Sequence, residues 1–119
     1  MNRVIHFEIP VENPERAIKF YEDVFGWEIT KWDGPFDYWL IKTGEEGEPG
    51  IDGALMTKEM GDIVKNTIAV ESFDEFAEKI QKNGGTMITE KMSVPGIGVM
   101  AAFEDTEGNV SAIMEPIME

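Results

Sequence analysis

The chain has 119 residues, which is enough for one domain built around one core. Its composition, 42% hydrophobic and 29% charged, is that of a folded protein and excludes intrinsic disorder. Ten Lys and Arg against 24 Asp and Glu leave a formal net charge of -14. Such a charge repels phosphate backbones and anionic lipid surfaces, so we expect no nucleic-acid partner and no membrane partner.

Cysteine is absent, which excludes disulfides, a thiolate nucleophile and a cysteine-based zinc site. Residues 1–10 carry charged side chains and lack the apolar core of a signal peptide. The sequence also contains no run of about 18 apolar residues. We therefore expect a cytoplasmic protein.

In the first half, apolar and polar residues alternate over 4–11, which predicts a half-buried strand. Asn13 and Pro14 then mark the start of an amphipathic helix, because Asn caps free N–H groups and Pro suits the first helical position. Gly26 marks its end. Aromatic and β-branched runs separated by Gly and Pro predict three more strands, over 27–32, 36–42 and 51–56.

The second half repeats this order. Shifting the chain by 59 positions places residues 65–72 over residues 6–13. Ser72 then takes the capping position, with Glu75 completing a capping box before a second amphipathic helix. Further strands are predicted over 86–92, 99–103 and 109–115. We predict one domain over 1–119 made of two modules, about 1–57 and about 65–119, joined by a linker over 57–64.

Two segments carry a family resemblance. They are HFEIPVENPERAIKFYEDVFGW from His6 and FEDTEGNVSAIME from Phe103. With them, the chain resembles the vicinal oxygen chelate superfamily, which includes glyoxalases, bleomycin resistance proteins and extradiol dioxygenases. The resemblance implies an α+β fold, in which two tandem βαβββ modules form a curved mixed sheet around a cleft, with the helices on the outer face. Enzymes of the family hold a divalent metal there with one ligand from each of four strands.

The resemblance assigns two of the four metal-ligand positions to suitable residues, His6 on the first strand and Glu115 on the last. Lys65 stands where the second module would supply a histidine, and the last strand of the first module offers Met56 or Thr57. Lysine has no lone pair near neutral pH, and methionine is a soft ligand. The resemblance thus implies at most a weakly bound divalent metal on His6 and Glu115, and a metal-free polar pair stays open.

Other residues are candidates for the same cleft. Glu8 lies two residues after His6 on the same face of a strand, and Glu8 or Glu115 could act as a general base. Candidate ligand-binding residues are Lys65, Thr67, Trp32 and Tyr38. The aromatic side chains among them suit stacking on a planar ligand, although a place in the core or in a dimer interface is the slightly favoured explanation.

Three functions fit these observations. The first is a glyoxalase-like or bleomycin-resistance-like protein that binds a small molecule in its cleft and has a degenerate metal site. The second is a metal-dependent lyase, isomerase or dioxygenase acting on a small substrate with adjacent oxygens. The third is a non-catalytic dimerisation or partner domain. The sequence leaves open whether the protein is an enzyme, while the resemblance implies a homodimer whose modules pair within one chain or by exchange between two.

Overall fold

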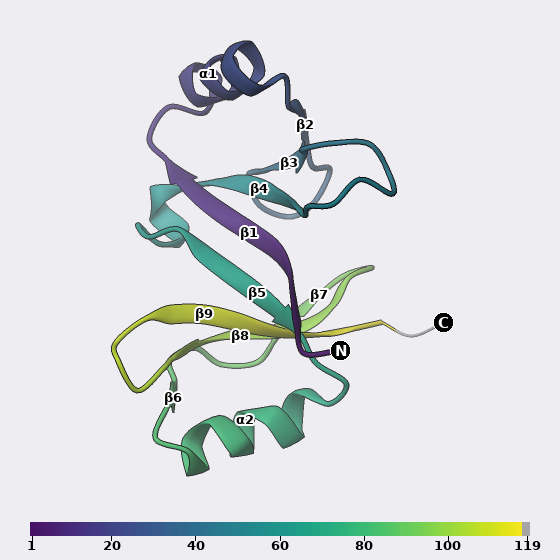
Figure 1. Ribbon diagram of the computed structural model, residues 1–119. Helices are drawn as coiled ribbons and strands as arrows, with labels where there is room; N and C mark the ends of the chain where they lie inside the picture. Colours follow the sequence, from purple (N-terminus) through teal and green to yellow (C-terminus); the bar gives the residue numbers. More distant parts are fainter. Residues whose placement is uncertain (118–119) are drawn as a thin grey trace. The chain divides into compact units, whose positions relative to one another are not determined.

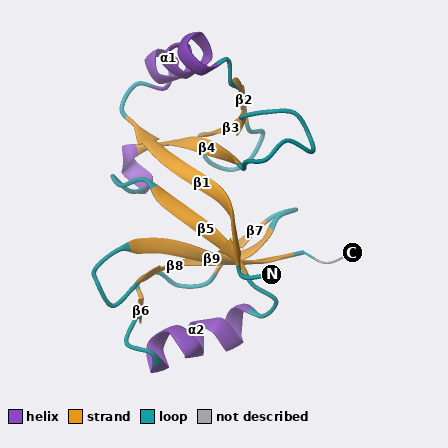
Figure 2. Cartoon of the chain, in the orientation of Figure 1, coloured by secondary structure: helices purple, strands orange, loops and turns teal. Residues whose placement is uncertain are grey.

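The computed structural model describes residues 1–117 and confirms the α+β fold class (Figures 1 and 2). The chain forms two compact units. The first unit comprises His6–Val64, and the second comprises Met1–Ile5 together with the chain from Lys65 onward. The first five residues join the second unit through contacts such as the hydrogen bond from Asn2 N to Ala69 O, at 2.7 Å.

The first unit contains the β-α-β-β-β order that the sequence predicts. Its elements are β1 (Arg3–Val11, which begins in the second unit), α1 (Pro14–Phe25), β2 (Glu28–Lys31), β3 (Tyr38–Lys42), β4 (Asp52–Thr57) and a 3₁₀ turn η1 (Lys58–Met60). The strand order is β2-β3-β4-β1, with β1 parallel to β4 and the other pairs antiparallel. The turn η1 falls in the segment expected to be a linker.

The second unit repeats this topology. Its elements are β5 (Lys65–Ala69), α2 (Phe73–Lys82), β6 (Thr86–Met87), β7 (Met92–Val94), β8 (Gly98–Glu104) and β9 (Val110–Pro116). The strand order is β5-β9-β8-β6, with β7 also paired to β8, and β5 is parallel to β9 as β1 is to β4. The duplication read from the sequence is therefore present in the strand pairing.

Both helices begin where the capping residues predict. The Asn13 side chain accepts a hydrogen bond from Arg16 N at 3.1 Å, and Ser72 Oγ accepts one from Glu75 N at 3.2 Å. The Glu75 carboxylate forms an ion pair with Lys79 along the helix. Gly26 ends α1 with a φ of 72°, in the left-handed region that glycine adopts without strain.

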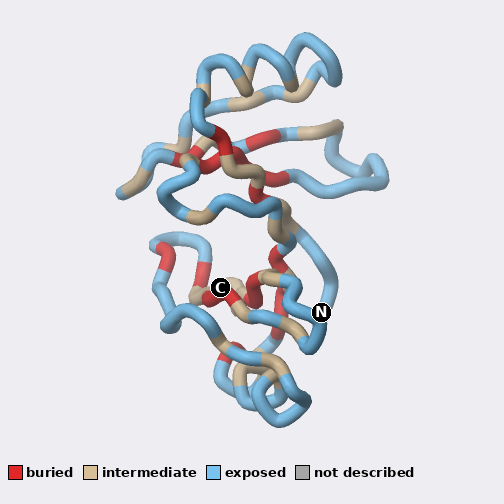
Figure 3. Tube along the Cα trace, turned by 90° about the vertical axis from the view of Figure 1, so that its left-hand side faces the viewer, coloured by how far each residue is buried: buried red, intermediate tan, exposed pale blue. Residues whose placement is uncertain are grey.

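In the first unit, α1 covers one face of the strands. Buried Val11, Ile41 and Leu55 form the centre of this core, and Ala17, Ile18 and Tyr21 of α1 pack against them. Phe7 lies beside Gly53 in the β1–β4 pair, where any Cβ on Gly53 would sit 2.6 Å from the Phe7 ring. The glycine thus makes room for the ring. Figure 3 shows that burial is concentrated in the strands.

In the second unit, α2 covers the corresponding face. Val70, Phe73, Ala101 and Ile113 are buried there. Partly buried apolar side chains of α2 and β8 surround them, including Phe76, Ala77, Ile80 and Phe103. The face of each strand that points away from its helix is therefore left for other contacts.

The strand predicted over 86–92 is interrupted. The structure has the short strands β6 and β7 instead, both paired with β8. Between them, Ala102 N donates a hydrogen bond to the Thr89 hydroxyl at 2.8 Å. In a regular β-ladder the acceptor would be a backbone carbonyl. A side chain that competes for a backbone donor breaks the strand, and the apolar and β-branched pattern of the segment does not reveal it.

Among the described residues, no helix combines the length and the apolar character that a membrane crossing requires.

Candidate functional site

The face of the first unit that points away from α1 carries the polar residues of β1. Alternation along the strand sends Phe7 and Ile9 toward α1, so His6 and Glu8 point the other way. Tyr38 of β3 shares this second face with Ala54 and Met56 of β4. Although the sequence pattern is that of a half-buried strand, Glu8 is only 6% exposed.

Three of these side chains form a hydrogen-bonded chain. The Tyr38 hydroxyl donates to Glu8 Oε2 at 2.5 Å, and His6 Nε2 lies 2.7 Å from the same hydroxyl oxygen. Ala54, the register partner of Glu8, packs in the same cluster as the Tyr38 ring, and its small side chain leaves room for that ring. The tyrosine, at 8% exposure, thus joins β3 to β1 across β4.

The contacts fix the position of the protons. Burial, followed by the charge of Glu8 and the hydrogen bond to it, raises the pKa of Tyr38 far above its ordinary value, so the phenol stays protonated. Its single hydrogen goes to Glu8, and its oxygen therefore accepts a hydrogen bond from His6 Nε2–H.

Burial lowers the pKa of His6, while the charges of Glu8 and Asp52 oppose that shift. The imidazole is then neutral near pH 7, and its lone pair lies on Nδ1. A ligand at this face meets a hydrogen-bond acceptor, and the Tyr38–Glu8 pair fixes the tautomer that provides it.

Aromatic rings adjoin the polar chain. The rings of Trp32 and Phe36 lie 5.0 Å apart, and each lies within 6 Å of the Tyr38 ring, at 5.8 and 5.7 Å. The Trp32 ring folds over Gly34, where a Cβ would be 2.2 Å away. The structure therefore brings two predicted ligand-binding residues, Trp32 and Tyr38, together with His6 and Glu8, and it adds Phe36.

The other two predicted ligand-binding residues lie on β5 in the second unit. Thr67 pairs with Ala112 on the face away from α2, since the neighbouring pair of Ile68 and Ile113 packs toward that helix. Thr67 is 1% exposed, and its hydroxyl has no hydrogen-bond partner among the described residues. Lys65, at the start of the same strand, is half-buried. Their contact with a ligand stays a prediction.

Glu115 lies in β9 of the second unit, on the same strand face as Ile113, which packs against α2. Its Oε1 accepts a hydrogen bond from Phe73 N, the first N–H of α2, at 2.7 Å. A carboxylate at this position satisfies a free helix N–H and meets the positive end of the helix dipole. This contact gives Glu115 a role in starting α2, and its roles as base and as metal ligand stay predictions.

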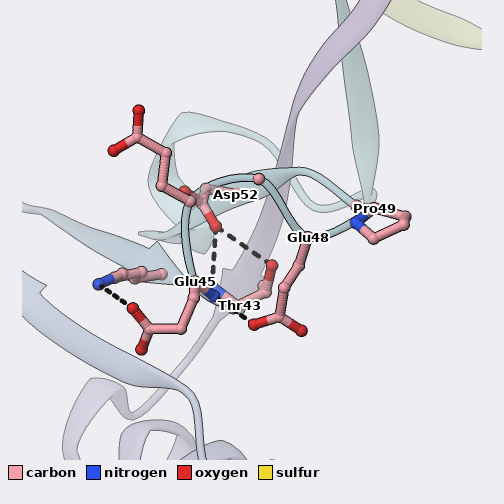
Figure 4. A pocket seen from close by; sticks show the side chains of 10 residues that line it. Thr43, Glu45, Glu48, Pro49 and Asp52 are labelled. Carbon is pink, nitrogen blue, oxygen red and sulfur yellow. Dashed lines mark hydrogen bonds and ion pairs between the residues drawn. The ribbon is translucent and has the colours of Figure 1, made fainter.

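A separate hollow of about 580 Å³ lies at the loop after β3 (Figure 4). Its acidic side chains hold the loop itself. Asp52 accepts hydrogen bonds from the backbone N–H and the hydroxyl of Thr43, and Glu48 accepts one from Glu45 N. Glu45 also pairs with Lys42 at 3.6 Å. The loop between β3 and β4 is therefore ordered by its own carboxylates.

The comparisons with known proteins agree with this architecture. Residues 3–113 match the Glyoxalase/Bleomycin resistance protein/Dioxygenase superfamily, to which the chain therefore belongs. It is 32% identical over 116 residues to a glyoxylase-like domain-containing protein of Didymella fabae, covering 89% of this chain and 88% of that protein.

Among solved structures, methylmalonyl-CoA epimerase from Mycobacterium tuberculosis has a TM-score of 0.72 at 16% identity, covering 97% of this chain and 88% of its own. A hypothetical protein from Bacillus halodurans C-125 has a TM-score of 0.76 at 16% identity, with 98% and 96% covered. At these identities the two structures show a shared fold.

The divalent metal that the resemblance implies does not fit the donors on this face of the first unit. The Tyr38 hydroxyl is hydrogen-bonded to both His6 Nε2 and one oxygen of Glu8, so a metal ion cannot bind these two atoms together. Over residues 1–117, no group of three or more His, Asp and Glu side chains is arranged to hold a metal ion. The pairing of His6 with Glu115 around a metal stays a prediction, and no metal enters the function proposed below.

Proposed function

We propose that this protein binds a small planar molecule at the His6–Tyr38–Glu8 chain, with Trp32 and Phe36 as the aromatic wall. The buried hydrogen-bonded chain is the observation that carries the proposal. Burying a carboxylate and an imidazole costs free energy, and well-packed apolar residues would serve stability as well or better. Such a polar group is therefore better explained by recognition of a ligand than by the folding of the unit.

The chemistry of the site defines the class of ligand. His6 Nδ1 accepts a hydrogen bond, so the ligand carries an N–H or O–H group. The Trp32 and Phe36 rings favour a flat apolar body. The Glu8 and Asp52 carboxylates near His6, and the net charge of -14, favour a neutral or cationic molecule over an anion. Small aromatic amines, amides and phenols meet these conditions.

Binding of such compounds is tested by thermal melting and by NMR of the imidazole, which is a clean probe because the chain has a single histidine. We expect some compounds from a panel of small aromatic amines, amides and phenols to raise the melting temperature of the protein and to shift the His6 resonances. The effect should be lost in His6→Ala and weakened in Tyr38→Phe. The exposed Lys19→Gln variant on α1 serves as the matched control and should bind as the wild type does.

If no compound of these classes changes either signal in the folded wild type, the binding proposal is wrong. The partner-domain function would then take its place, because it requires no small-molecule ligand.

A second function, proton transfer, is favoured by the same chain of contacts. A neutral imidazole with its lone pair on Nδ1 can take a proton from a carbon next to a carbonyl group, and the nearby charge of Glu8 stabilises the resulting imidazolium. Acetophenone, a flat and neutral ketone, is the first compound to try, because the carboxylates near His6 and the net charge of -14 disfavour an anion. Exchange of its α-hydrogen in D₂O, lost in His6→Ala, would support an enzyme, and no exchange above buffer would exclude this reaction.

A further inference from the structure

A groove of about 410 Å³ lies in the first unit, at the carboxyl ends of the parallel strands β1 and β4. The register pairs Val11 with Thr57, so the two strands end side by side. β1 is followed by α1 and β4 by η1, and residues of both elements line the groove. Its volume is in the range of small-molecule pockets. It lies apart from the His6–Tyr38–Glu8 chain, whose residues do not line it.

Two cations face this groove, Arg16 from the first turn of α1 and Lys58 from η1. Lys58 Nζ lies 3.5 Å from Glu12 Oε1, so Glu12 offsets its charge. Among the described residues, no carboxylate oxygen lies within 4.0 Å of the Arg16 guanidinium nitrogens, the limit for an ion pair. In a chain with 24 acidic and ten basic residues, an arginine in a groove without an acidic partner is available to a ligand. Arginine binds carboxylates through two parallel hydrogen bonds.

An apolar wall adjoins the cations. Phe20 follows Arg16 by four residues and so lies on the same side of α1. Its side chain lines the groove and is 55% exposed. The ring of Tyr21, which also lines the groove, meets the Phe20 ring edge-on with centroids 5.1 Å apart. An exposed ring supported by a second ring provides a surface for stacking a flat ligand.

We propose that this groove is a second ligand site, which binds a small aromatic carboxylate. The carboxylate pairs with Arg16 at the charged end, beside the Lys58–Glu12 ion pair, and the ring of the ligand lies on Phe20. The site differs in charge from the one proposed above, which favours neutral or cationic molecules, so the two sites select different ligands.

The test uses 1-naphthoate, with the neutral 1-naphthamide as its matched compound, and follows backbone and arginine side-chain signals by NMR. We expect naphthoate to shift the signals of residues 9–21 and of Lys58, and to bind about tenfold more tightly than the amide, since the charge-assisted contact to arginine is lost in the amide. Added salt should weaken the naphthoate complex, because the partners are partly exposed charges.

Variants separate the contributions. Arg16→Gln should weaken naphthoate binding about tenfold and remove its advantage over the amide. Phe20→Ala should weaken both compounds. Lys19→Gln, on the same helix and outside the groove, should bind like the wild type, and so should His6→Ala, which removes the first proposed site and leaves this one intact.

Equal binding of naphthoate to the wild type and to folded Arg16→Gln would overturn the proposal, as would shifts centred on Trp32 and Phe36. Absence of naphthoate binding at millimolar concentration would overturn it as well. The first and third of these results leave the function proposed for the His6–Tyr38–Glu8 chain unaffected, whereas shifts centred on Trp32 and Phe36 would also contradict the preference of that site for neutral or cationic ligands.

Discussion

Tyr38 has one hydroxyl hydrogen, and the position of that hydrogen decides the chemistry of its neighbours. Because it goes to Glu8, the imidazole of His6 must supply its own Nε2–H and presents Nδ1 to a ligand. The hydroxyl is thus a structural link between β1 and β3, and it sets the hydrogen-bonding character of the face on which it lies.

Removing this hydroxyl should weaken the fold. In Tyr38→Phe the buried Glu8 carboxylate and His6 Nε2–H both lose a partner, and we expect the free energy of unfolding to fall by about 1–3 kcal/mol. Urea denaturation measures it. Tyr21→Phe is the control, because the Tyr21 ring stacks on Trp27 and its hydroxyl makes no hydrogen bond within the described residues. That variant should stay within about 0.5 kcal/mol of the wild type. Equal losses in both variants would contradict the linking role.

The protonation of His6 should make stability depend on pH. Burial lowers the native pKa of His6 below the ordinary 6.5, so the unfolded chain binds the proton more readily than the native state does. The free energy of unfolding therefore rises with pH through this interval. The contribution is fully present above about pH 6.5 and is lost as the pH falls through the native pKa.

The difference between the wild type and His6→Gln isolates this effect from the titration of carboxylates. We expect the wild type to lose stability relative to the variant as the pH falls below about 6.5. NMR titration of the single imidazole should give a pKa below 6.5. A pKa above that value would show that the charges of Glu8 and Asp52 outweigh burial, and the pH dependence would then have the opposite sign.

The sequence predicted the residues of this site better than their contacts. Alternation along β1 placed His6 and Glu8 on one face, and Tyr38 was a ligand-binding candidate. Sequence reasoning did not find the hydrogen bond between them, since it depends on β4 lying between β1 and β3. The signal was the small residue Ala54 at the middle of a strand, which leaves room for a long side chain to reach across.

At the scale of elements, the start of α2 combines two capping groups. Ser72 Oγ accepts a hydrogen bond from Glu75 N, and the Glu115 carboxylate on β9 accepts one from Phe73 N. The first of these follows from the local sequence, because a capping box lies within four residues. The second joins residues 42 positions apart and follows only from the pairing of β5 with β9.

Substituting Glu115 tests its role at this helix. Glu115→Ala removes the acceptor and the negative charge, and we expect a loss of about 1–2 kcal/mol in the free energy of unfolding. Glu115→Gln keeps an acceptor oxygen and should lose less than about 1 kcal/mol. Glu104→Ala, an exposed carboxylate on β8, is the control and should have little effect. If both Glu115 variants unfold like the wild type in metal-free buffer, the contact with α2 does not stabilise the protein.

At the scale of the whole molecule, the duplication was predictable because each module repeats the same local signals in the same order. Strand, cap, helix and glycine occur at matching positions, and both units pair their first strand parallel to their last. The buried polar residues of the two first strands also correspond, since Glu8 and Thr67 are related by the repeat. Their surroundings differ. Glu8 receives a hydrogen bond from Tyr38, whereas the Thr67 hydroxyl has no partner among the described residues.

The whole chain should hold no tightly bound divalent metal after purification without added ions. His6 offers a metal ion only the lone pair of Nδ1, Glu115 Oε1 accepts a hydrogen bond from Phe73 N, and the family resemblance assigns Lys65 to a further ligand position. A zinc site of the catalytic type needs three protein ligands and an open position. Elemental analysis after dialysis should therefore find metal well below one ion per chain. Added zinc, nickel or manganese should not raise the melting temperature of the wild type more than that of His6→Ala. Near-stoichiometric metal that is lost in His6→Ala would contradict this, and the metal-dependent lyase, isomerase or dioxygenase would then become the leading function.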